Sequence, residues 1–252
     1  MTRGKRMKKN NNTKIIFYFI VYFLLFFVLI YSGIKIYEWY RDKNKNNEIA
    51  KKIKETVIVE SNGKNKEEYL IDFDKLKEQN NEAIAWIKVN NTNIEYPVVK
   101  TKNNEFYLNH SFDKSENLGG WIFADYKNKF NGTDKNIVIY GHNMKDNSMF
   151  GTMQNILNQE WYNNEENTNI ILKTEGKNYI YKVFSIYRIE NEDYYIKTEF
   201  NNDSEFEQFL NTLKARSIRD FNMDMLESDS ILTLSTCDNN NKYRVVLHAK
   251  KI

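Results

Sequence analysis

The chain has 252 residues, with 37 lysines and arginines against 34 aspartates and glutamates, which gives a formal net charge of +3 at pH 7. That length allows one large domain or two small ones. The lysines are scattered among acidic residues, as on an ordinary solvated surface, so the composition excludes a dedicated nucleic-acid-binding protein. Residues 70–252 contain neither an internal repeat nor a low-complexity linker, which favours a single domain there.

The N-terminus joins a basic segment to a long apolar one. Residues 1–14 carry six basic side chains and no acidic one, residues 15–31 are wholly apolar or aromatic, and residues 32–37 extend that run. About 20 apolar residues span a bilayer as a helix, and no Ala-x-Ala cleavage pattern follows. We therefore predict an uncleaved, single-pass signal-anchor over 15–37, with a buried core helix as the alternative.

The charge flanking this segment predicts its orientation. Basic residues before a membrane span favour a cytoplasmic N-terminus, which places the C-terminal part outside the cell, although the other flank at 35–45 is also basic. The predicted organisation is a cytoplasmic basic tail at 1–14, the anchor at 15–37, a stalk or N-terminal helical segment at 38–72, and the main domain at 73–252.

Short predicted strands dominate the main domain. A helix opens at Asp72 or Asp74, either of which can cap it, and an amphipathic helix covers 203–215 behind a cap at Asn202 or Asp203. A further short helix is predicted at 149–157. Strands are predicted at 86–89, 94–99, 106–108, 120–124, 136–140, 170–172, 179–189, 231–237 and 243–252. Many short strands separated by turns predict a mainly β fold, a closed or nearly closed barrel with helical insertions.

The one cysteine of the chain ends a β-prone run. The run Thr-Leu-Ser-Thr-Cys ends at Cys237, polar residues 238–241 follow, and a second β-prone run carries Arg244. If 238–241 form the loop, Cys237 pairs with Lys242 and Ser235 with Arg244; direct pairing of Cys237 with Arg244 is the alternative. Side chains alternate along a strand, so either register places Cys237 and Arg244 on one face, whereas a slip of one residue separates them.

A single cysteine outside a membrane forms no intramolecular disulfide, so Cys237 is either reactive or a buried bystander. A free thiol has a pKa of about 8.5, and a nearby cation or imidazolium stabilises the thiolate. Of the three histidines, His142 follows a glycine at the end of a buried-looking strand, which suits display at a barrel rim. We prefer it as the partner of Cys237; His248 on the last strand is the alternative, and His110 lies in a polar loop.

Together these residues resemble a known family. The Thr-Leu-Ser-Thr-Cys strand, Arg244 seven residues later and Tyr-Gly-His-Asn around His142 are similar to the motifs of sortases, the membrane-anchored cysteine transpeptidases of Gram-positive bacteria. The resemblance covers about residues 80–252. The runs at 104–110 and 120–126, and the long helix before the cysteine strand, resemble class B in particular.

The resemblance implies a fold and a reaction. The fold would be a closed sortase-type β-barrel with N-terminal helices, a long helix inserted before the Cys-bearing strand, and an N-terminal transmembrane helix. Cys237 matches the nucleophile that forms a thioester acyl-enzyme, His142 the general acid and base, and Arg244 the arginine that holds the substrate and stabilises the oxyanion. No cofactor is implied, and the cysteine and histidines lack the spacing of metal ligands.

The same resemblance implies the binding partners. The substrate would be a sorting-signal peptide of a secreted surface protein, of the Asn-Pro-x-Thr type and cleaved after Thr, and the acceptor an amine of peptidoglycan or its lipid-linked precursor. The residues that match substrate-groove positions are Asn104, Leu108, Tyr195, Ile196, Ser235 and Asp238. The loop 238–241 is short for the class, and Asp238 beside the thiol disfavours the thiolate.

Two other functions fit the same residues. A cysteine peptidase that only hydrolyses its substrate uses similar groups, although papain-like enzymes place Cys before His and seat the thiol at a helix start. A non-catalytic surface-binding barrel with a buried thiol is the alternative outside enzymes.

Overall fold

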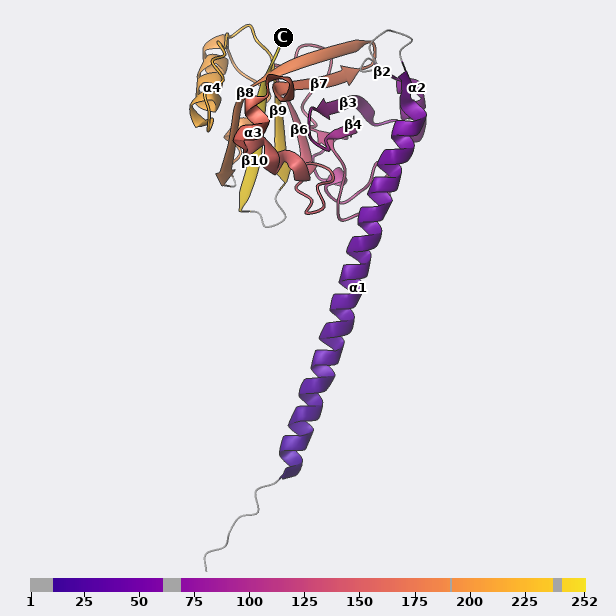
Figure 1. The fold of residues 1–252 in the computed structure, drawn as a ribbon. Coiled ribbons are helices and arrows are strands. Elements are labelled where there is room, and N and C mark those ends of the chain that lie inside the picture. Colours follow the sequence, from indigo (N-terminus) through magenta and orange to yellow (C-terminus); the bar gives the residue numbers. More distant parts are fainter. Residues whose placement is uncertain (1–10, 61–68, 191, 238–241) are drawn as a thin grey trace, which may run out of the picture. The chain divides into compact units, whose positions relative to one another are not determined.

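The computed structural model describes residues 11–60, 69–190, 192–237 and 242–252. The chain divides into two compact units, Met1–Asn44 and Lys45–Ile252. Helix α1 (Asn11–Val57) is continuous and contributes to both (Figure 1). Its side chains over 15–37 are almost all exposed, and the helix is long and apolar enough to cross a membrane. This is the predicted candidate span.

The second unit is built on a closed barrel, as predicted (Figure 1). The strands follow the order β10-β8-β7-β3-β4-β5-β6-β9, and β9 pairs with β10 to close the ring. Two pairs, β4 with β5 and β6 with β9, are parallel, and the other pairs are antiparallel. The strands are β3 (Ala83–Val89), β4 (Glu95–Val99), β5 (Phe123–Ala124), β6 (Asn136–His142), β7 (Asn169–Thr174), β8 (Lys177–Glu190), β9 (Ile231–Cys237) and β10 (Tyr243–Lys251).

Shorter elements complete the second unit. A two-stranded pair, β1 (Ile58–Glu60) with β2 (Tyr69–Ile71), precedes helix α2 (Phe73–Gln79), whose predicted cap Asp72 accepts a hydrogen bond from the Lys75 N–H. The remaining short helices lie between strands: the 3-10 helices η1 (Phe106–Leu108), η2 (Gly151–Leu157), η3 (Glu165–Thr168) and η4 (Tyr194–Ile196), and α3 (Gln159–Asn163).

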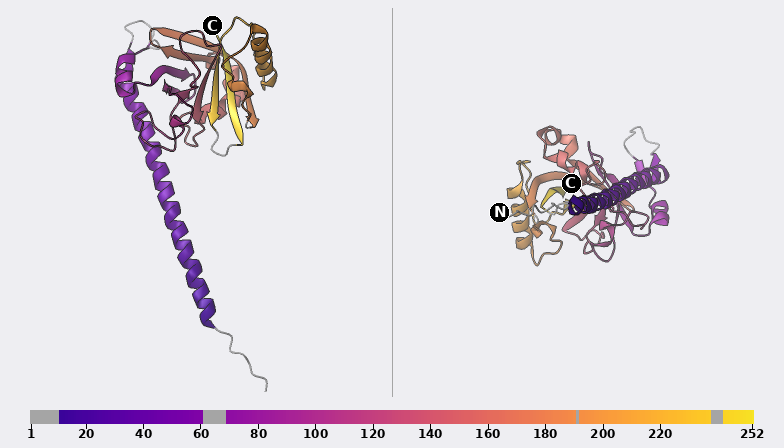
Figure 2. Two further views of the ribbon diagram at one scale, coloured as in Figure 1. Left: turned by 180° about the vertical axis from the view of Figure 1, so that it is seen from behind. Right: turned by 90° about the horizontal axis from the view of Figure 1, so that it is seen from below.

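Helix α4 (Asp203–Arg216) covers part of the outside of the barrel (Figures 1 and 2). The predicted cap Asn202 accepts from the Glu205 N–H at 2.9 Å. The buried stripe Phe206, Phe209, Leu210 and Leu213 packs against outward-facing residues of β8, β9 and β10. These strands therefore contact apolar residues on both faces, since Leu232 and Leu234 of β9 point into the barrel while Ile231 packs under α4.

Local polar contacts override propensity at one predicted strand. Residues 106–108 are β-prone and aromatic, but they form the 3-10 helix η1. The Asn103 side chain accepts from the backbone N–H groups of both Glu105 and Phe106, which turns the chain before it can extend. The strand prediction was wrong there. Similarly, most of the helix predicted at 149–157 is the 3-10 helix η2.

Candidate active site

The parallel ladder between β6 and β9 places His142 beside Cys237. Seven residue pairs run in register from Asn136 with Ile231 to His142 with Cys237. Adjacent strands lie about 4.8 Å apart. The backbones of the two candidate catalytic residues are thus neighbours at the ends of neighbouring strands, although they lie far apart in the sequence.

The register between β9 and β10 excludes one of the two hairpin pairings considered above. Ser235 pairs with Val246, so the predicted pairing of Ser235 with Arg244 is wrong. The direct pairing of Cys237 with Arg244 would continue this register by two residues, beyond the last pair of the ladder, and it stays a prediction. The ladder changes near its end, where the Val245 N–H donates to the Thr236 hydroxyl at 2.8 Å.

The imidazole of His142 is held by a backbone carbonyl. Its Nε2 lies 2.7 Å from the carbonyl oxygen of Leu108, and the residue is half-buried. A carbonyl oxygen only accepts, so Nε2 donates the proton, and Nδ1 is the ring nitrogen on which a proton can be gained or lost. The contact fixes both the orientation of the ring and its tautomer.

A glycine makes this contact possible. Gly120 has φ +54°, and a Cβ there would lie 2.4 Å from the Tyr107 oxygen, 2.8 Å from the Leu108 oxygen and 2.8 Å from His142 Cδ2. Real Cβ atoms do not approach so closely, and the positive φ is itself unfavourable for other residues. The loop at Gly120 is therefore packed directly against the candidate base and the carbonyl that orients it.

The alternative histidine has a different environment. His248 is fully buried; its Nε2 lies 2.9 Å from the Tyr187 hydroxyl and its Nδ1 2.9 Å from the Thr233 hydroxyl. Thr233 donates its proton to Asn136 Oδ1, so it accepts from His248 Nδ1–H, and Tyr187 donates to Nε2. Burial lowers the pKa of His248 to about 3. Both ring nitrogens of the neutral imidazole are thus hydrogen-bonded. On the strand ladder His248 lies opposite Thr233, away from Cys237.

The candidate groove residues divide into buried and partly exposed ones. Tyr195 and Ser235 are buried and their hydroxyls lie 2.9 Å apart. Asn104 is half-buried; its amide donates to Asp125 at 2.8 Å and accepts from the Tyr126 N–H. Leu108 and Ile196 are partly buried hydrophobic residues packed against the core. Asp238 and the side chain of Cys237 lie outside the described residues.

A residue that sequence reasoning missed connects the barrel to η4. The Asn136 side chain on β6 donates to the carbonyl oxygens of Tyr195 and Lys197, at 3.3 and 2.9 Å, while accepting from Thr233. It therefore ties the segment that carries Tyr195 and Ile196 to the two strands that end in His142 and Cys237. The available signal was an asparagine opening an otherwise apolar strand.

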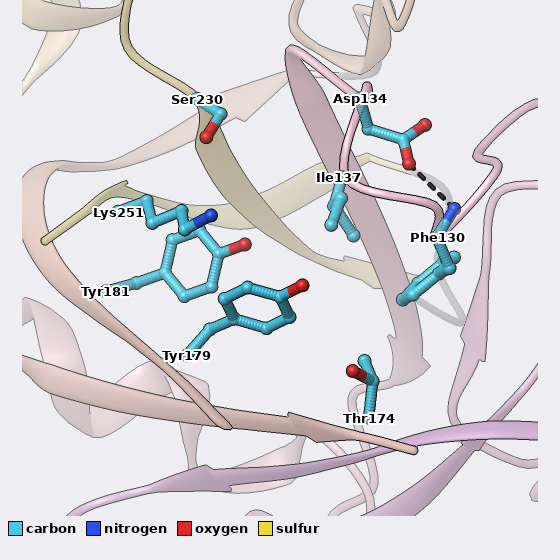
Figure 3. A pocket seen from close by; sticks show the side chains of 9 residues that line it. Phe130, Asp134, Ile137, Thr174, Tyr179, Tyr181, Ser230 and Lys251 are labelled. Carbon is cyan, nitrogen blue, oxygen red and sulfur yellow. Dashed lines mark hydrogen bonds between the residues drawn. The ribbon is translucent and has the colours of Figure 1, made fainter. Parts of the chain in front are cut away.

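A small pocket lies at the opposite end of these strands (Figure 3). It is lined by residues near the starts of β6 and β9 and the end of β10, and Asp134 accepts there from the Phe130 N–H at 2.7 Å. A strand rises about 3.3 Å per residue, so the length of β6 separates this pocket from His142. Among the residues that the structure describes, no group of three or more His, Cys, Asp or Glu could hold a metal ion.

Comparisons with known proteins agree on one family. The sequence profile of the Sortase domain matches residues 87–252. Sortase B of Listeria monocytogenes is 34% identical over 233 residues, which cover 89% of this chain and 92% of that protein.

Solved structures give the same result. The structure of Clostridium perfringens sortase B is 37% identical, with a TM-score of 0.67, and the match covers 72% of this chain and 100% of that one. A Staphylococcus aureus sortase B–substrate complex is 34% identical, with a TM-score of 0.67, over 71% of this chain and 84% of that one. A sortase B complexed with triglycine has the same identity and TM-score, over 71% of this chain and 85% of that one.

Proposed function

Because this chain belongs to the sortase family and is a cysteine transpeptidase of the sortase B type, we propose that Cys237, His142 and Arg244 carry out its reaction. One observation supports this assignment above all. The ladder between β6 and β9 pairs His142 with Cys237 on the backbone, and the register of β9 with β10, if continued two residues beyond Ser235 and Val246, would put Arg244 on the other side of Cys237.

In the first half-reaction, the Cys237 thiolate attacks the carbonyl carbon of the Thr residue in the sorting signal. A tetrahedral intermediate forms, and its collapse breaks the peptide bond and leaves a thioester on Cys237. The departing amine needs a proton, which His142 supplies. In the second half-reaction, an incoming amine attacks the thioester, His142 takes a proton from it, and the thiolate leaves.

The geometry of His142 indicates which nitrogen exchanges the proton. Nε2–H is directed to the Leu108 carbonyl, so Nδ1 gives and receives the proton in both half-reactions. The Leu108 carbonyl also stabilises the imidazolium that exists before amine departure, since its oxygen carries partial negative charge. Leu108 thereby contributes to the site through its backbone.

Arg244 supplies positive charge next to the reacting carbonyl. A fixed cation stabilises the negative oxygen that develops in the tetrahedral intermediate. Removing a single donor of this kind costs about 10²–10³ in kcat in other enzymes. Arg244→Lys keeps the charge but loses the planar fork, so it is expected to lose part of that amount.

The comparisons support a peptide as acyl donor and an amine as acceptor. A sorting peptide of the Asn-Pro-x-Thr type is the acyl donor, and an amine of peptidoglycan or its lipid-linked precursor is the acceptor. Sortase B structures hold a substrate in one case and triglycine, a peptide with a free amine, in another. Leu108, Ile196, Asn104 and Asp238 are proposed to line the peptide groove. The buried pair Tyr195–Ser235 would support its wall from below.

The N-terminal helix is proposed to anchor the enzyme in the cell membrane as a single span. Residues 1–14 would remain cytoplasmic, 15–37 would cross the bilayer, and the catalytic domain at 73–252 would face the cell wall. The segment 38–72 would link them, and its part from Lys45 onward belongs to the same compact unit as the barrel. Protease added outside intact cells should then release or degrade the catalytic domain while the basic tail is protected.

Cleavage of a labelled Asn-Pro-x-Thr peptide by the full chain in detergent micelles tests the function. The expected result is cleavage by the wild type that is abolished in Cys237→Ala. Product analysis with and without added triglycine then distinguishes a transpeptidase from a hydrolytic cysteine peptidase. A transpeptidase forms an amide between the peptide and triglycine, whereas a peptidase yields only the free acid.

Retained cleavage in Cys237→Ala would overturn the mechanism. The alternative of a non-catalytic surface-binding barrel has a separate test. A buried thiol that only packs in the core should resist a methanethiosulfonate reagent in the folded protein, whereas a nucleophilic thiol should react. As Cys237 is the only cysteine, the modification needs no mapping.

A further inference from the structure

The membrane-anchor helix continues into the catalytic unit and buries one face there. Asn46, Ile53 and Val57 are 3%, 1% and 0% exposed, and the partly buried Ala50 packs against the barrel's core cluster. These positions recur at the spacing of one helix face. The last turns of α1 are therefore an integral part of the folded catalytic unit.

Asn46 is the polar member of this face, and its amide is fully used. Its Oδ1 accepts from the Ser111 hydroxyl at 2.6 Å and from the Asn117 amide at 3.1 Å. Its Nδ2 donates to the Gly120 carbonyl at 3.0 Å and to Asn117 Oδ1 at 3.3 Å. An asparagine amide has two donor hydrogens and two acceptor lone pairs, so each is satisfied inside the protein. Ser111 and Asn117 are themselves buried, at 0% and 2% exposed.

The loop that Asn46 holds is the one packed against the candidate base. Asn117 Oδ1 also accepts from the Gly119 N–H at 2.8 Å, and the Gly120 N–H donates to the Asn117 carbonyl at 3.0 Å. Gly120 lies so close to the Leu108 oxygen and to His142 Cδ2 that even a methyl group would not fit. The contacts therefore run without a gap from the Asn46 amide through the Gly120 backbone to the imidazole and the carbonyl that orients it.

We propose that Asn46 is a positioning residue for His142, so that the helix carrying the membrane anchor also orients the general acid and base. This rests on the proposed role of His142. Asn46 touches no reacting atom. It fixes the carbonyl of Gly120, and through the tight contact of that residue it limits how far the ring can rotate from the Leu108 carbonyl.

The main variant removes the amide, and the control removes a neighbouring side chain on the same face. Asn46→Ala loses every bond to the loop. Asn46→Ser is a milder version, since its hydroxyl is too short to reach Gly120. Ile53→Ala lies two turns further along α1 and loses only apolar contacts. All are made in the full chain in detergent micelles, with the melting temperature measured alongside peptide cleavage.

The expected result is a separation of activity from stability. Asn46→Ala should lower kcat about 10- to 100-fold, since small misplacements of a catalytic group have effects of this size, while KM stays within about twofold. The pH dependence of iodoacetamide alkylation of Cys237 should also shift, because the ring that exchanges protons beside it is less constrained. Ile53→Ala should lower the melting temperature at least as much as Asn46→Ala does, but its kcat and its alkylation profile should stay close to those of the wild type.

The proposal is overturned if the folded Asn46 variants keep the kcat and the alkylation profile of the wild type. It is also overturned if Asn46→Ala and Ile53→Ala lose kcat in proportion to their loss of melting temperature. The alkylation measurement needs no substrate. Failure of the wild type to cleave the peptide would therefore count against the proposed function, while an unshifted alkylation profile would count against the role of Asn46.

Discussion

Two histidines flank β9, and their surroundings differ. His142 on β6 is paired with Cys237 at the strand's end, is half-buried, and directs Nε2 to a carbonyl. His248 on β10 is paired with Thr233 in the middle of the strand, is fully buried, and has a hydroxyl on each ring nitrogen. The same side chain on the two strands that flank β9 is thus placed for proton exchange in one case and for structural support in the other.

The difference shows what determines a histidine's role in a barrel wall. A carbonyl partner fixes one tautomer and supports the charged ring, whereas burial between hydroxyls favours the neutral ring alone. The hydroxyl of Thr233 donates its proton to Asn136, which holds the carbonyls of Tyr195 and Lys197. His248 therefore belongs to a buried network that supports the groove wall from behind.

The largest expected effect separates the two histidines by activity. His142→Ala should lower kcat for peptide cleavage by about 10³-fold, within the range usual for loss of a general acid and base, because no other group would protonate the departing amine. His248→Asn should change kcat far less in the fraction that is folded. The measurement is kcat for cleavage of the labelled peptide by both variants and the wild type. An equal loss in the two would mean that His248 takes part in the chemistry.

The next effect concerns the close packing at Gly120. Gly120→Ala is expected to displace the Leu108 carbonyl and the His142 ring and to lower kcat by about 10²-fold. Gly132→Ala is a matched control, because Gly132 also has a positive φ, +92°, but an added Cβ would meet nothing within 4 Å. Both variants place an alanine at a positive φ, but only the Cβ of Gly120→Ala would meet the His142 ring. Comparable kinetics for the two would show that the His142 contact is unimportant.

A smaller effect appears in the pH dependence of stability. The pKa of His248 is about 3 in the folded chain and about 6.5 when unfolded. The unfolded state therefore binds more protons between these values, and stability falls as pH drops through that window. From pH 7 to pH 5 the His248 contribution should be about 2 kcal/mol. The free energy of unfolding, measured by urea denaturation at pH 5 and pH 7, should fall by about that amount more in the wild type than in His248→Gln. An equal fall in the two proteins would contradict the prediction.

The smallest effect tests how the His248 network reaches η4. The Tyr194 hydroxyl donates to the Tyr187 hydroxyl at 3.0 Å. Tyr194→Phe removes this one bond at a half-buried position and should destabilise the fold by about 1 kcal/mol. A double-mutant cycle with Tyr187→Phe isolates the pairwise energy. Strictly additive losses would show that the two hydroxyls are not coupled.

Local patterns in the sequence were sufficient for much of this fold. The apolar spacing of 203–215 is the buried stripe of α4, and alternation along 179–189 lies within β8. The position of His142 after Gly141 indicated a strand end, and β6 ends there. In each case the pattern and the element that it predicts lie in the same short stretch of sequence, so propensity and periodicity are adequate guides.

Non-local pairing was beyond those patterns. The parallel contact of β6 with β9 joins segments separated by most of the second half of the chain, and no residue in either strand specifies its neighbour. Asn46 was one polar residue in the segment predicted at 38–72, and Gly120 opened the strand predicted at 120–124. Their importance depends on close approach in three dimensions, which a linear pattern does not encode.

The ladder between β6 and β9 has a consequence for how such enzymes diversify. The spacing of the proposed nucleophile and the proposed base is set by backbone pairing between two strands of the barrel wall, and not by the segment 238–241 that follows Cys237. Residues can therefore be inserted into or removed from that segment while His142 and Cys237 stay on neighbouring strands. Substrate preference can drift, or be engineered by grafting longer segments there, with the chemical step preserved.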